Sequence, residues 1–150
     1  MKRKYLLVIF LLLTIILCLY FYISSMYSKN SNEYLEEVWK LKIPEKYRVE
    51  EIYTSKDRWM GDGSRIFSLA SSSINDNEFK WKANKPLDEK LVKRVYDSVA
   101  EDALRVSNLS APSLSDLKII NLLVSKEKDD YLLITFSQKD NRYYIFEDLT

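Results

Sequence analysis

Residues 131–147 read YLLITFSQKDNRYYIFE, and this stretch decides the fold. Tyr131 to Ser137 and Arg142 to Glu147 are rich in the β-branched and aromatic residues that favour strands. Lys139-Asp140-Asn141 lies between them and supplies the polar residues typical of a turn. The stretch therefore predicts a β-hairpin.

The segments before this hairpin extend the pattern. Leu117 to Ser125 holds an apolar run that fits a buried strand or a helix, and we favour a strand because two strands follow it. Pro86-Leu87-Asp88 opens a long helix, expected from Asp88 to Ser107 with Asp88 as its cap. Its expected apolar stripe consists of Leu91, Val95, Val99 and Ala103, widened by Val92, Tyr96, Ala100 and Leu104.

Shorter strands are expected before the long helix. Tyr47 to Ser55 is one, with a bulge near Glu50-Glu51 where strict alternation breaks. Gly61-Asp62-Gly63 predicts a hairpin turn, and Ser64 to Ala70 then alternates as the next strand. Phe79-Lys80-Trp81-Lys82 predicts a short further strand.

The order of these elements indicates the α+β class. A short helix is expected from Glu33 to Lys40, with Ser31 or Asn32 as its cap. Strands on both sides of one long helix predict an antiparallel sheet packed on that helix. We expect this domain to occupy residues 33–150, after a polar linker at 26–32.

An apolar run without charge, Pro or Gly extends from Tyr5 to Ile23, directly after Lys2-Arg3-Lys4. As a helix it measures about 28 Å, roughly the hydrocarbon thickness of a bilayer. The basic cluster on one side predicts that the residues before the run are cytoplasmic and those after it lie outside. We therefore expect residues 1–25 to be a cytoplasmic tip and an N-terminal transmembrane helix, with the lipid bilayer as partner through Tyr5 to Ile23. The expected location is the cell membrane, with a single pass.

The apolar run has two other interpretations besides a membrane anchor. A secretory signal peptide cleaved near Ser25 stays open as an alternative, although the run exceeds the usual apolar core of about 7–15 residues. A lipoprotein needs a small residue before the modified cysteine, at the end of the apolar region. Cys18 follows Leu17 in the middle of the run, which disfavours lipidation.

Composition excludes several kinds of chemistry. The chain has no His, and its single Cys is Cys18 within the apolar run. Ser-His-Asp and Cys-His catalysis and the usual His-rich zinc sites therefore lack their residues. We expect no catalytic residue, no cofactor and no metal, and hence no enzyme. The residues after 25 hold 22 acidic and 20 basic side chains, interspersed, which argues against a nucleic-acid partner.

Several aromatic and charged side chains form a possible interaction surface. Phe79-Lys80-Trp81-Lys82 alternates aromatics and cations and suits anionic headgroups or an acidic wall polymer, although a core-facing edge strand fits as well. Gly61-Asp62-Gly63 and Asn75-Asp76-Asn77-Glu78 place carboxylates at turns, which solvated turns also explain. Tyr143 and Tyr144 alternate faces, so one ring is exposed or covered by something. The candidate surface consists of Trp59, Asp62, Lys80, Trp81, Lys82, Tyr143 and Tyr144.

The segments Trp59-Met60-Gly61-Asp62-Gly63, Arg65 to Leu69, Phe79-Lys80-Trp81 and Tyr131 to Phe146 together resemble a group of known proteins. These are small, uncharacterised, membrane-anchored or secreted proteins of low-GC Gram-positive bacteria, with a Gly-Asp-Gly turn and a C-terminal aromatic hairpin. Members of this group often carry His-Gly-Gly ahead of the turn, where this chain has Asp57-Arg58-Trp59. The resemblance implies a bacterial envelope setting and supplies no activity.

Three functional hypotheses follow from the sequence. The first is a membrane-anchored extracytoplasmic module that binds an envelope protein or polymer. The second is an immunity-type protein that intercepts a toxin at the membrane, as the small size, the anchor and the aromatic residues would allow. The third is an envelope hydrolase that uses two carboxylates, for which the sequence spacing offers no specific support.

Overall fold

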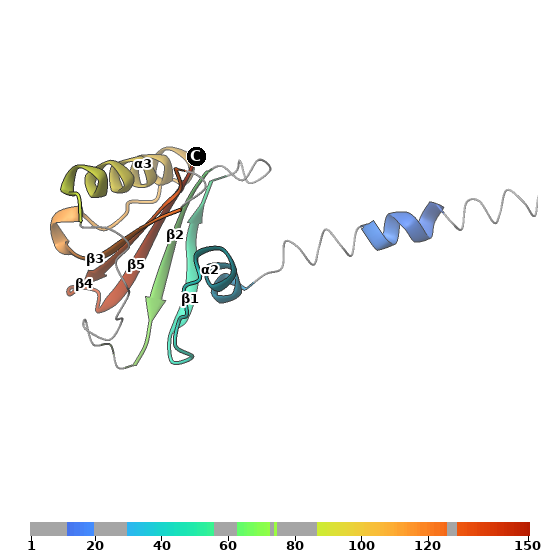
Figure 1. The fold of residues 1–150 in the computed structure, drawn as a ribbon, viewed down its shortest axis with the longest axis horizontal. Coiled ribbons are helices and arrows are strands. Elements are labelled where there is room, and N and C mark those ends of the chain that lie inside the picture. The colour runs from blue at the N-terminus through green and yellow to red at the C-terminus, as the bar shows by residue number, and fades with distance from the viewer. Residues whose placement is uncertain (1–11, 20–29, 56–62, 73, 75–86, 126–128) are drawn as a thin grey trace, which may run out of the picture. The chain divides into compact units, whose positions relative to one another are not determined.

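The computed structural model describes residues 12–19, 30–55, 63–72, 74, 87–125 and 129–150 (Figure 1). The chain forms two compact units, Met1–Leu41 and Lys42–Thr150. Of the predicted anchor, only residues 12–19 are described, and they are helical. Among the described residues, no helix has both the length and the apolar character that crossing a membrane requires. The rest of the run from Tyr5 to Ile23 and the cleavage position near Ser25 lie outside the described residues.

Helix α2 (Ser31–Trp39) belongs to the first unit and begins two residues earlier than predicted. Its cap is Asn30, whose side-chain oxygen accepts a hydrogen bond from the backbone N–H of Asn32. The prediction of Ser31 or Asn32 as the cap is therefore wrong. Asn, Ser and Asp serve about equally well as N-cap residues, so a run of them does not specify which one caps the helix.

The second unit confirms the predicted α+β class, with an antiparallel sheet packed on one long helix (Figure 1). The helix is α3 (Glu89–Ser107), and a short 3₁₀ helix, η2 (Leu114–Asp116), follows it. The sheet has the strand order β1-β2-β5-β4-β3. Its strands are β1 (Arg48–Thr54), β2 (Gly63–Ala70), β3 (Leu117–Val124), β4 (Tyr131–Ser137) and β5 (Arg142–Leu149). The ambiguous run from Leu117 is thus a strand, as favoured. The predicted strand at Phe79 to Lys82 lies outside the described residues.

Helix α3 begins and ends where its sequence predicts. The Asp88 carboxylate accepts hydrogen bonds from the backbone N–H groups of Lys90 and Leu91, at 2.9 and 3.3 Å. Asn108 ends the helix in the left-handed conformation, with φ 56°. The apolar stripe is rotated from the predicted one, since its buried residues are Val92, Val95, Val99 and Ala103. Leu91 is only partly buried, and Leu104, predicted to widen the stripe, is 51% exposed.

One apolar cluster joins α3 to the sheet. Ile66 of β2, Leu133 of β4 and Phe146 of β5 meet the helix stripe there, and all three are fully buried. The Tyr96 ring packs edge-on against Phe146, with 5.2 Å between ring centroids. Burial of these side chains supplies the main driving force for docking α3.

The opposite face of the sheet is buried too. Its buried apolar residues are Phe67, Leu69, Leu123, Leu132, Ile134, Phe136, Tyr143 and Ile145. Tyr47, which precedes β1, packs edge-on against Tyr143, and the Phe136 ring also contacts Tyr143, with 5.0 Å between ring centroids. Glu147 shares this face, is fully buried, and pairs with Arg65 on the neighbouring strand at 3.1 Å.

Both edge strands carry a bulge. The β1–β2 register shifts between Glu51 and Tyr53, close to the bulge predicted at Glu50-Glu51. The β3–β4 register shifts between Ile119 and Asn121, which was not predicted. Bulges twist edge strands and discourage pairing with other chains, so both edges of this sheet are protected.

Candidate functional site

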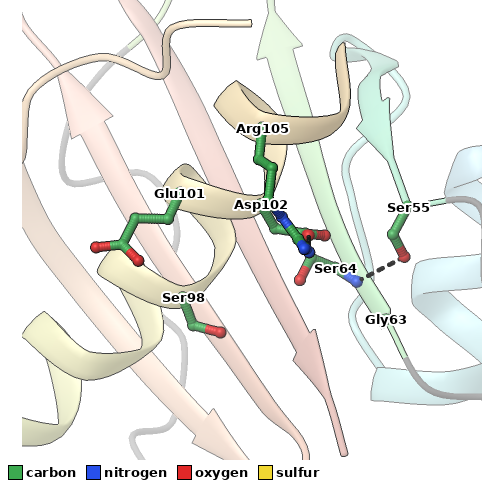
Figure 2. Close-up of a pocket in the computed structure, with 7 residues that line it drawn as sticks. All are labelled: Ser55, Gly63, Ser64, Ser98, Glu101, Asp102 and Arg105. Atoms are coloured by element: carbon green, nitrogen blue, oxygen red, sulfur yellow. Dashed lines mark hydrogen bonds and ion pairs between the residues drawn. The ribbon is translucent and has the colours of Figure 1, made fainter. Parts of the chain in front are cut away.

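An open pocket of about 460 Å³ lies where α3 passes the hairpin end of β1 and β2 (Figure 2). We call it the α3–β2 pocket. Among the described residues, those that line it are Ser55, Gly63, Ser64, Ser98, Glu101, Asp102 and Arg105. The four helix residues follow the spacing i, i+3, i+4 and i+7, which places them on one side of α3, beside the buried stripe.

Backbone and hydroxyl contacts fix the hairpin end of the pocket. The backbone N–H of Ser55 donates to the carbonyl of Ser64 at 2.8 Å. The N–H of Ser64 in turn donates to the Ser55 hydroxyl oxygen at 3.0 Å. Gly63 has φ +134°, and a Cβ there would lie 2.2 Å from the Ser55 Oγ. Glycine is therefore required at position 63 for both conformation and space.

Asp102 connects α3 to the sheet through side-chain hydrogen bonds. The buried Tyr53 hydroxyl donates to Asp102 Oδ2 at 2.7 Å, and Arg105 Nη2 donates to Oδ1 at 2.7 Å. Burial alone raises the pKa of this carboxyl. Hydrogen bonds from Arg105, Tyr53 and Ser64, together with the Arg105 charge, outweigh burial and hold the pKa below its usual range. Asp102 is thus a fixed, ionised anchor between helix and sheet.

Asp148 of β5 lies next to the pocket and behaves in the opposite way. The Ser98 hydroxyl donates to Asp148 Oδ1 at a long 3.4 Å. Burial raises the pKa of this carboxyl, and the nearby charges of Asp102 and Asp130 raise it further. The Ser98 hydrogen bond and the charge of Arg94 only partly offset this shift. The region around the pocket is therefore rich in negative charge.

The two remaining charged side chains of the pocket differ in orientation. In Figure 2 the Arg105 and Asp102 side chains converge near Ser64, whereas the Glu101 side chain points away from them. Glu101 is exposed and makes no hydrogen bond or ion pair with another described residue. Within the described part of the chain, no three Asp, Glu or Cys side chains gather closely enough to hold a metal ion.

The structure places only two of the predicted interaction residues. Tyr143 and Tyr144 lie on opposite faces of β5, as expected, and both are buried, at 0% and 8% exposure. Tyr143 packs against Tyr47 and against Phe136, and the Tyr144 hydroxyl donates to Asp140 at 3.2 Å. Neither ring is offered to a partner on an open surface, because both side chains are buried. The other candidates lie outside the described residues: Trp59, Asp62, Lys80, Trp81, Lys82 and the run from Asn75 to Glu78.

Sequence reasoning missed the α3–β2 pocket. The one local signal was Asp102, a carboxylate three residues after Val99 on the flank of the apolar stripe. Its partner Tyr53 lies 49 residues away in the chain, so the pairing depends on tertiary structure.

Comparison of the chain with protein families, curated proteins and solved structures finds no match.

Proposed function

We propose that this protein is anchored in the bacterial cell membrane by a single helix formed from Tyr5 to Ile23. The residues before that helix lie in the cytoplasm, and the α+β domain lies outside, where it binds an envelope protein or polymer. The observation that carries the proposal is Lys2-Arg3-Lys4 directly before an uncharged run long enough to cross a bilayer.

The chemistry of the pocket favours binding over hydrolysis. A hydrolase with two carboxylates needs one that releases a proton and one that acts as base or nucleophile. Asp102 is occupied by Tyr53 and Arg105, and its lowered pKa makes it a poor proton donor. Its hydrogen bonds instead suit a rigid wall for a binding pocket.

Paired reporter fusions test the orientation. Alkaline phosphatase after Thr150 is expected to be active, because that enzyme requires the oxidising exterior, and a green fluorescent protein that folds only in the cytoplasm is expected to be dark. A variant with Lys2, Arg3 and Lys4 changed to Glu is expected to reduce the phosphatase signal, since the positive charges set the orientation. Fluorescence without phosphatase activity would refute the proposed topology.

A further inference from the structure

We draw no further inference here: the strongest candidate, the pair of buried polar atoms Ser68 Oγ and Arg142 Nε on the α3-facing side of the sheet near the β4–β5 hairpin, which have no hydrogen-bond partner among the described residues, carries nothing because those residues do not show what covers the pair.

Discussion

Replacing Asp102 with Ala tests whether this carboxylate holds α3 on the sheet. The change removes the acceptor of the Tyr53 hydroxyl and of Arg105, both at 2.7 Å. Tyr53 is 4% exposed, so its hydroxyl loses a partner in a buried site, which costs about 1–3 kcal/mol. The Arg105 side chain is 80% exposed and turns to water, which adds at most about 1 kcal/mol. We expect a loss of about 2–3 kcal/mol in the free energy of unfolding.

Urea unfolding of the purified chain, followed by tryptophan fluorescence, measures this loss. The matched control is Asp97→Ala on the same helix, since Asp97 forms an exposed ion pair with Lys93 and is expected to change stability by about 0.5 kcal/mol or less. A double-mutant cycle with Tyr53→Phe is expected to give a coupling energy of about 1 kcal/mol. Equal effects of Asp102→Ala and Asp97→Ala, or a coupling energy of zero, would refute the role of Asp102.

The same variant has a defined pH dependence. The folded-state pKa of Asp102 lies below its unfolded value of about 3.9, so its contribution is present above that pH. The contribution is lost as pH falls through the folded-state pKa. The stability difference between wild type and Asp102→Ala is therefore expected to be constant near neutral pH and to shrink below about pH 4. A difference that grows on acidification would contradict this assignment.

Three further substitutions test other parts of the structure. Glu147→Ala removes a fully buried carboxylate 3.1 Å from Arg65 and is expected to destabilise by about 3–5 kcal/mol in urea unfolding, with Glu147→Gln less harmful. Gly63→Ala forces a Cβ to within 2.2 Å of the Ser55 Oγ at φ +134°, so we expect a loss of about 1–3 kcal/mol that Ser55→Gly relieves only in part. Asp148→Asn is expected to raise the melting temperature at pH 7, because the raised folded-state pKa makes ionisation above about pH 4 unfavourable, and this gain vanishes in acid. An unchanged melting temperature of Asp148→Asn at pH 7 would contradict the raised pKa of Asp148.

The elements of the second unit were predictable because their signals are local. Asp88 marks the start of α3 through a cap within three residues, and alternating aromatic and β-branched residues mark β4 and β5. Which side of α3 faces the sheet was harder to predict, because Leu91 and Val92 are adjacent in the chain and both are apolar. The sheet surface then selects Val92 and leaves Leu104 largely exposed.

The candidate site was not predictable because its contacts join distant parts of the chain. Ser55 and Ser64 meet across a hairpin, and Tyr53 reaches Asp102 on α3. The burial of Glu147 was equally hidden, since alternation in β5 predicts two faces but does not reveal that both are covered. Partner atoms on other elements decide burial and pairing in each of these cases.

Cysteine accessibility in intact cells tests the membrane anchor most directly. Cys18 is the single cysteine, so a Cys18→Ser background leaves only the introduced thiol. Ser115→Cys at an exposed position of η2 is compared with Lys2→Cys, using a maleimide that does not cross membranes. We predict that the Ser115→Cys protein is labelled in intact cells, and that the Lys2→Cys protein is labelled only after permeabilisation, with both proteins resisting carbonate extraction. The opposite labelling pattern, or release of the protein by carbonate, would contradict the proposed anchor and its orientation.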